Sequence, residues 1–230
     1  MCVVGLHGAR YIKGIHRIST RTFTYTVNRA MNVMEFFQQS AGDWQSQRTT
    51  HHLPFRRAEL GGSNISVEAL PADNEKVIEI CKMHEIDPQT AVGGAYVTWN
   101  GEMAWDKEGE DHKGSTVFAL VPDADNPQMG NLLRERGYAE VVPVIGRYEM
   151  DSENGLVLTT DYETMSSIER FWFASPDLRI RTSVVKRFGG LSTASFCAES
   201  RRETVPERGE DDAAAREAFD IASEYSSFGW

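Results

Sequence analysis

The sequence predicts an all-β protein with two short helices, built as an up-and-down antiparallel barrel or as a sandwich. Short segments with alternating polar and apolar residues fill most of the chain, and residues typical of turns separate them. The two helical segments both lie in the first half of the chain. Because strands do not alternate with helices, the sequence argues against a doubly wound α/β fold.

The expected secondary structure consists of two helices and ten strands. Residues 31–41 and 72–86 have helical periodicity, and Cys81 falls on the buried stripe of the second helix. The strands are expected at 44–57, 63–70, 93–100, 102–107, 114–122, 138–150, 155–163, 167–174, 178–187 and 191–201. Turns are expected at 60–63, 100–101, 151–155, 174–177 and 188–190.

Charge is distributed unevenly along the 230 residues. The net charge is −10, but residues 1–30 hold five basic residues and no acidic one, so the remainder carries −15. We expect 1–30 to be a basic extension outside the fold, as a translated leader upstream of Met31 rather than a targeting segment. The barrel is then expected at 31–202, followed by an acidic tail at 203–230 in which 211–222 has helical character.

Composition also limits the partners and the compartment. An acidic chain is a poor ligand for nucleic acid or an anionic membrane, and no apolar run reaches the length of a membrane span. Cys2, Cys81 and Cys197 are widely spaced, which predicts a reducing, cytoplasmic location without a disulfide framework. We expect Cys81 and Cys197 to pack in the core, and neither to carry a ligand covalently.

The stretch from Trp44 to His52 is polar on both faces when its side chains alternate. Trp44, Arg48 and His52 share one face, and His51 lies on the other. Adjacent histidines on a strand diverge and do not chelate one metal ion together, so no metal site is expected. A strand without an apolar face fits a barrel whose interior is wet or filled by a ligand.

Two further segments combine aromatic and charged side chains. Trp99 and Trp105 lie on either side of the expected turn at 100–101, where they would flank a flat conjugated ligand. Glu169, Arg179 and Arg181 lie around the expected turn at 174–177, and arginine suits the recognition of carboxylates.

The length of that second turn decides which residues share a face. A three-residue turn places Glu169 on the face of the two arginines, whereas a two- or four-residue turn places Arg170 and Trp172 there instead. The sequence leaves both registers open.

These motifs resemble the S-type phycobiliprotein chromophore lyases, the CpcS/CpeS family of cyanobacteria and related algae. The resemblance runs from Met31 to Arg202 and is carried by "MNVMEFFQQSAGDWQSQRTTHHL", "YVTWNGEMAWD", "ERFWFASPDLRIRTS" and "GLSTASFCAESR". Within it, Gly42-x-Trp44 is the mark of lipocalin-like barrels, in which the tryptophan plugs one end and packs on an arginine from a late strand.

The resemblance implies a ten-stranded, antiparallel, up-and-down lipocalin-like (calycin) β-barrel. Such a barrel would hold a phycobilin, either phycocyanobilin or phycoerythrobilin, and attach it through a thioether to a cysteine of a phycobiliprotein subunit. The partners would be the bilin and the apo-subunit; the chain would act either alone or in a homo- or heterodimer with a related lyase chain. The location would be the cyanobacterial cytosol, or the plastid stroma in an alga.

The resemblance and the chemistry of a bilin together define the expected site. The residues expected to take part in catalysis are Glu169, His51 and His52. The residues expected to bind the bilin are Trp44, Arg48, Trp99, Trp105, Arg179 and Arg181. Two alternatives remain open: a bilin carrier without a chemical role, and an unrelated calycin with a small hydrophobic ligand, which the polar Arg, His and Trp pattern disfavours.

Overall fold

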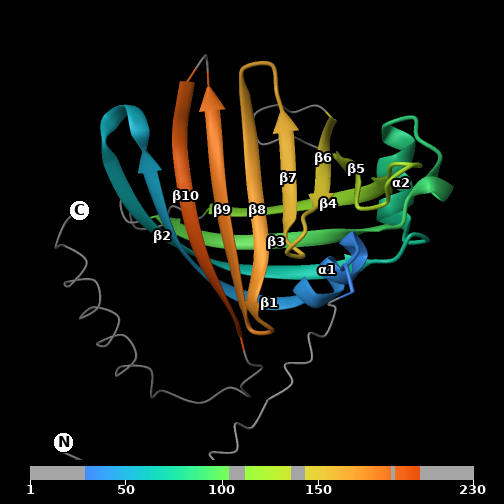
Figure 1. Cartoon of the computed structure of the whole chain (residues 1–230), viewed down its shortest axis with the longest axis horizontal. Helices are drawn as coiled ribbons and strands as arrows, with labels where there is room; N and C mark the ends of the chain where they lie inside the picture. Colours follow the sequence, from blue (N-terminus) through green and yellow to red (C-terminus); the bar gives the residue numbers. More distant parts are fainter. Residues whose placement is uncertain (1–28, 104–111, 136–142, 188–189, 203–230) are drawn as a thin grey trace, which may run out of the picture.

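The computed structural model describes residues 29–103, 112–135, 143–187 and 190–202, and in these residues ten antiparallel strands close into one barrel (Figure 1). Consecutive strands pair with each other, and the first strand pairs with the last. The strands are β1 (Gly42–His52), β2 (Arg57–Leu70), β3 (Gly93–Met103), β4 (His112–Pro122), β5 (Met129–Arg134), β6 (Val144–Met150), β7 (Leu156–Asp161), β8 (Met165–Ser175), β9 (Leu178–Arg187) and β10 (Gly190–Arg201). The up-and-down barrel is confirmed, and the sandwich is excluded.

Two of the expected turns are wrong because tertiary pairing overrides the local preference of glycine. Residues 60–63 lie inside β2, where Gly61 pairs with Arg48 on one side and Met103 on the other. Residues 100–101 lie inside β3, where Gly101 pairs with Ser63. The residues expected to begin a separate strand at 102 therefore continue β3, and residues 104–107 lie outside the described part of the chain.

Other boundaries also differ from expectation. The first strand ends at His52 rather than at residue 57, because a 3₁₀ turn at Leu53–Phe55 follows it and Arg56 adopts a left-handed backbone with φ of 51°. The short strand β5 was not expected, since its Gly130 and the polar segment before it read as a loop. The helix expected at 211–222 lies outside the described residues.

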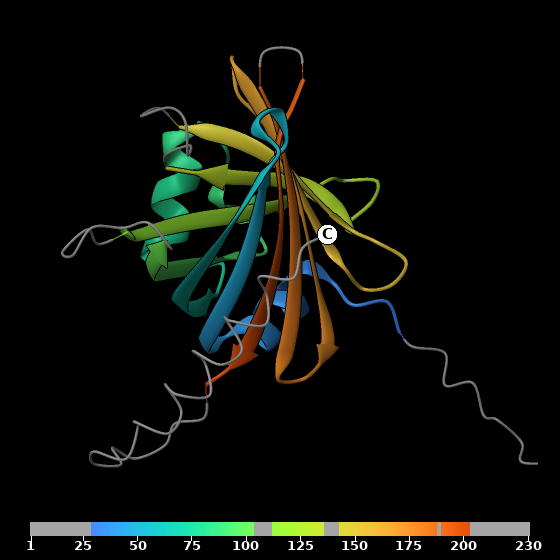
Figure 2. The same ribbon diagram turned by 90° about the vertical axis from the view of Figure 1, so that its left-hand side faces the viewer.

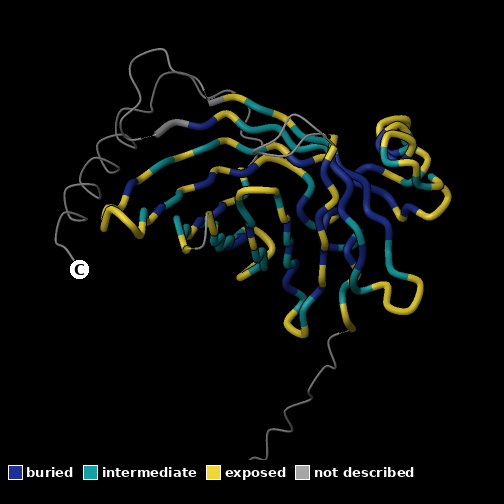
Figure 3. Tube along the Cα trace, turned by 90° about the horizontal axis from the view of Figure 1, so that it is seen from above, coloured by how far each residue is buried: buried dark blue, intermediate teal, exposed yellow. Residues whose placement is uncertain are grey.

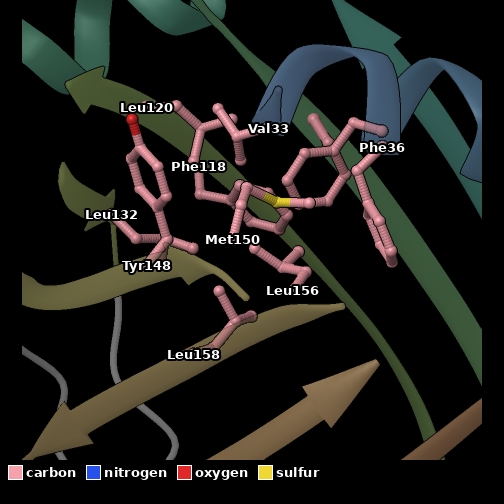
Figure 4. Packing of buried hydrophobic residues seen from close by; sticks show 11 residues of the cluster. Val33, Phe36, Phe118, Leu120, Leu132, Tyr148, Met150, Leu156 and Leu158 are labelled. Carbon is pink, nitrogen blue, oxygen red and sulfur yellow. The ribbon is translucent and has the colours of Figure 1, made fainter. Parts of the chain in front are cut away.

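Helix α1 (Val33–Ser40) closes one end of the barrel. It begins with a capping box, in which the Asn32 side chain accepts from the backbone of Glu35 and the Glu35 side chain accepts from the backbone of Asn32, both at 2.9 Å. Its apolar stripe enters the barrel and joins a buried cluster (Figure 4). The buried members of this cluster are Val33, Phe36, Phe37, Ala95, Phe118, Leu120, Leu132, Tyr148, Met150, Leu156 and Leu158.

Helix α2 (Glu75–Met83) covers the outside of β4 and β5. Val77 and Cys81 pack there against Leu133 in a second buried cluster. Burial, followed by a smaller contribution from Asp87, raises the pKa of the Cys81 thiol. The expected core position of Cys81 is confirmed. Within the described residues, no helix combines the length and the apolar character needed to cross a membrane.

The two ends of the barrel differ, because among the described residues α1 lies across only one of them; we call that end the closed end and the opposite one the open end. The turn between β8 and β9 lies at the end that holds α1, while the turns from β1 to β2 and from β7 to β8 lie at the opposite end (Figures 1 and 2). At the closed end, the Asn154 side chain accepts from the Met31 backbone at 2.8 Å. Buried and exposed residues alternate along the strands, so one face of each strand lines the interior (Figure 3).

Tyr148 in the core gives the fold a component of stability that depends on alkaline pH. The side chain is 1% exposed, and burial, together with nearby Asp123, raises its pKa to about 12 from the ordinary value of 10.0. The pKa of Tyr148 is higher in the folded protein than in the unfolded chain. Its contribution to the free energy of unfolding is therefore fully present below pH 10 and is lost as pH rises toward 12. The expected loss is roughly 2 to 3 kcal/mol.

Tyr148→Phe is expected to remove this component. The variant's free energy of unfolding, measured in urea between pH 9 and 12, should fall less with pH than that of the wild type. At pH 7 the two proteins should differ by only about 1 kcal/mol, since the hydroxyl donates one long hydrogen bond, of 3.3 Å, to the Pro127 carbonyl. Parallel pH curves for the two proteins would contradict the assignment.

Candidate functional site

The barrel encloses a cavity of about 480 Å³, a size typical of small-molecule sites. At the closed end Phe36 and Phe37 of α1 form part of its lining. The cavity wall is formed by Phe36, Phe37, Arg48, Gly62, Ser63, Ile65, Val67, Val97, Trp99, Gly101, Thr116, Phe118, Arg134, Leu156, Leu158, Glu169, Phe171, Arg179, Arg181, Ser183, Ser195, Cys197 and Glu199. Its charged side chains come from β1, β5, β8, β9 and β10.

A β-bulge decides which side chains of the β8–β9 hairpin face the cavity. Ser175 pairs with Leu178, so the turn has two residues, which alone would direct Arg170 inward. The ladder shifts by one residue between Phe173 and Ser175, and Phe173 then pairs with Arg179. The bulge therefore places Glu169 on the inner face with the arginines, despite the two-residue turn.

The outward residues of this hairpin have separate roles. Arg170 donates to Asp151 and Glu153, both at 2.7 Å, and its guanidinium lies 4.8 Å from the Trp172 ring centroid. These contacts lie on the outside of β8. Arg170 and Trp172 thus belong to the outer surface rather than to the cavity.

Glu199 on β10 joins the cavity arginines into one network. Its carboxylate is completely buried and lies 2.6 Å from Arg179 Nε and 3.3 Å from Arg181 Nε. Arg181 continues the network to Glu169, with an Nη1–Oε1 distance of 3.4 Å. Burial lowers the pKa of the Arg179 guanidinium, and pairing with Glu199 opposes that shift. The network fixes both arginines before any ligand enters.

Sequence reasoning missed Glu199 and Arg134. Glu199 lies in a strand of small residues, and only its alternation with Cys197 signals an inward side chain. Arg134 is 4% exposed and follows the buried Leu132 at a spacing of two on β5, a strand that was not expected. Both residues line the cavity. Had β5 been expected, its alternation of side chains would have placed Arg134 on the same face as Leu132.

Trp44 forms the plug that the Gly-x-Trp motif predicts. It is fully buried, its Nε1 donates to the Ser40 carbonyl at 2.8 Å, and its ring lies between two guanidinium groups. The distances from ring centroid to guanidinium carbon are 4.3 Å for Arg201 and 4.8 Å for Arg179. Since Trp44 is absent from the cavity wall and Arg179 is part of it, the indole lies behind Arg179.

Gly42 and Arg201 explain why the motif begins with glycine. Gly42 has a φ of 115°, and a Cβ there would lie 3.0 Å from Arg201 Nη1. The Arg201 guanidinium donates to the carbonyls of Gln39 and Ala41, both at 2.7 Å, which satisfies the C-terminal end of α1. The expected contact between Trp44 and an arginine from a late strand is confirmed.

The first strand is regular, so its two histidines point apart. The ladders to β2 and β10 run without a bulge from Trp44 to His52. Arg48 faces inward and lines the cavity, whereas His51 is exposed on the outside. The His52 ring lies on the inner face at the open end, where its Nε2 contacts Glu59 Oε2 at 2.7 Å. Neither histidine lines the cavity.

Trp99 lines the cavity and packs across Gly114 of the neighbouring strand. The two residues are cross-strand partners, and a Cβ on Gly114 would lie 2.3 Å from the indole Cζ2. The glycine therefore leaves the space that the indole occupies. The expected pairing of Trp99 with Trp105 across a turn is wrong, since β3 continues through 100–101, and Trp105 lies outside the described residues.

Gly114→Ala is expected to displace Trp99. Overpacking against the indole should lower the free energy of unfolding by about 1 to 3 kcal/mol, and the Trp fluorescence maximum should shift. Gly190→Ala is the matched control, because no atom lies within 4 Å of its added Cβ. Equal urea midpoints and emission spectra for the two variants would contradict this account of Trp99.

Cys197 is buried among the core residues, as expected, with 2% of its surface exposed, and it also forms part of the cavity wall. It pairs with Arg48 on β1 and Arg181 on β9, and alternation along β10 turns it inward. Burial is the largest effect on its thiol and raises the pKa, while Arg181 opposes the shift. A thiol with a raised pKa is a weak nucleophile at neutral pH.

Comparisons with known proteins find similar sequences over most of the chain. Chromophore lyase CpcS/CpeS 2 of Trichodesmium erythraeum is 62% identical over 200 residues, which cover 87% of this chain and all of the relative. The phycocyanobilin lyase subunit CpcS of a Picosynechococcus strain is 68% identical over 172 residues, 75% of this chain and 87% of the relative.

A solved structure and a family model extend the match. The S-type phycobiliprotein lyase CPES from Guillardia theta superposes with a TM-score of 0.67 at 36% identity, over 76% of this chain and 95% of that one. The model of the family described as "CpeS-like protein" matches residues 32–202, which span all ten strands and both helices. On the fold, the sequence and the family model together, this chain belongs to the CpeS-like proteins.

Proposed function

We propose that this protein is a bilin lyase, which binds a linear tetrapyrrole in its barrel and attaches it by a thioether to a cysteine of a phycobiliprotein subunit. Membership of the CpeS-like proteins supports the proposal, as do the lyase names of its relatives. The bilin would be phycocyanobilin or phycoerythrobilin. We place the reaction in the cytoplasm, or in the stroma of a plastid.

The charge of the cavity is the observation that carries the proposal. The wall contains four arginines and two glutamates, so guanidinium groups outnumber carboxyl groups inside a chain whose net charge is −10. A bilin carries two propionates and a long conjugated plane. The surplus of guanidinium groups is complementary to the propionates, and Trp99 and Phe171 provide flat apolar surfaces for the rings.

The proposed chemistry assigns separate roles to the cavity acid and to the histidines. The sulfur of the acceptor cysteine bonds to the ethylidene carbon of ring A, and the bilin gains the proton that the thiol loses, so no oxidant is required. Glu169, on the wall beside Arg181, would supply a proton to the bilin as general acid. His51 and His52, at the open end of β1, would accept the thiol proton. Arg48, Arg179 and Arg181 would hold the propionates.

One assay separates the lyase from a carrier without a chemical role. Apo-subunit and bilin are mixed with and without this protein, and the covalent adduct is followed by zinc-induced fluorescence and mass spectrometry. A lyase should raise the initial rate and give one adduct, because it holds the bilin in one geometry. Equal rates and equal product mixtures would refute the lyase proposal and leave the carrier. Absorption spectra with each of the two bilins would identify the preferred one.

A further inference from the structure

The outer surface of the barrel carries an apolar stripe that leads to the open end. Among the described residues nine large hydrophobic side chains are exposed; four of them lie on β8, β10 and β2, and two more lie in the 3₁₀ turn between β1 and β2. These six are Leu53, Phe55, Leu60, Ile168, Leu191 and Phe196. We call this set the outer stripe.

Cross-strand pairing places members of the outer stripe in two neighbouring rows. Phe196 on β10 pairs with Thr49 on β1, which in turn pairs with Leu60 on β2. One row nearer the open end, Ile168, Val184, Ala194, His51 and Ala58 follow one another across the five strands. Neither of these two rows contains a carboxylate side chain.

The polarity of β10 around Phe196 is reversed with respect to an ordinary half-buried sheet. Antiparallel sheets usually turn apolar side chains inward and polar ones outward. On β10, however, Ser195 and Cys197 face the cavity, while Phe196 between them faces outward and is 49% exposed. An exposed apolar surface of this kind marks an interaction site.

The charges beside the outer stripe distinguish between two classes of partner. Arg56 and Arg57 directly follow the 3₁₀ turn between β1 and β2, and Lys186 and Arg187 end β9 at the same end of the barrel; all four are exposed. In a twofold dimer through this surface, the four cations of both copies would share one interface. An acidic protein surface with an apolar centre is complementary to them.

We propose that the outer stripe is the docking surface for the acceptor subunit, an inference that rests on the proposed lyase function. Because α1 closes the other end, the bilin's reactive ring must reach the acceptor thiol at the open end. The stripe and its cations border that end. The acceptor would therefore bind against β10, β1 and β2 and present its cysteine at the mouth of the cavity.

The double variant Leu60→Gln, Phe196→Gln tests the proposal on the full chain. Its Kd for apo-phycobiliprotein subunits, measured by titration calorimetry with the bilin-loaded protein, is expected to rise by about tenfold or more. Bilin absorbance should be unchanged, because both side chains point away from the cavity. Ile145→Gln on β6 is the matched control, since Ile145 is equally exposed on the far wall, and it should bind as the wild type does.

Three outcomes would overturn the proposal: no binding of the apo-subunit by the wild type, an unchanged Kd in the double variant, or dissociation of a wild-type dimer by the variant without loss of acceptor affinity. Dissociation of a wild-type dimer would show that the outer stripe is a contact between two copies of this chain. Phe55→Ser, at a turn residue that is 74% exposed, repeats the test without disturbing a strand. Binding without adduct formation would refute the lyase function alone.

Discussion

Glu199→Gln is expected to lower the free energy of unfolding by about 3 to 5 kcal/mol, the cost of leaving buried charge uncompensated. The carboxylate is completely buried, and it is the shared partner of Arg179 and Arg181. Glutamine keeps the shape but removes the negative charge, so two guanidinium groups lose their common counterion. Urea unfolding at pH 7 measures the change.

Glu153→Gln is the matched control for that experiment. Glu153 also pairs with an arginine at 2.7 Å, but its side chain is 77% exposed. Water screens such a pair, and the variant should differ from wild type by no more than about 1 kcal/mol. If Glu199→Gln unfolds at the same urea concentration as this control, Glu199 does not hold the arginines as described.

Glu169→Gln is expected to slow thioether formation by about 100- to 10,000-fold, the usual range for removal of a general acid. Glutamine still accepts a hydrogen bond from Arg181, so the arginine should stay in place and the bilin should remain bound. Single-turnover mixing of the bilin-loaded protein with excess apo-subunit separates the chemical step from bilin loading.

A surface control completes this test. Glu149→Gln, on the outward side of β6, should match wild type in rate. A Glu169→Gln rate within twofold of wild type would assign the proton to another group.

The fold was predictable because most of its signals are local. The capping box at Asn32 and Glu35 and the alternating strands follow from nearest neighbours in sequence, as does the stripe of α2. The errors fall where partners distant in sequence decide the outcome. Gly61 and Gly101 resemble turn residues, yet each is paired on both sides by other strands.

The site was predictable in part for the same reason. Arg48, Trp99, Glu169 and the two β9 arginines line the cavity as expected, although the bulge that turns Glu169 inward has no strong sequence signal. Glu199 escaped notice because a lone glutamate on a strand is usually exposed, and only its distant arginines make burial tolerable. The contributions of all these cavity residues to binding and catalysis remain predictions.

The closure of one end by α1 sets an order of events. Under the proposed function, a cavity with one opening would admit and release its contents by the same path, and an acceptor bound across that opening would block the path. The bilin would then enter first and the acceptor second, and the modified subunit would leave before the next bilin is taken up. A barrel open at both ends would impose no such sequence on its reactants.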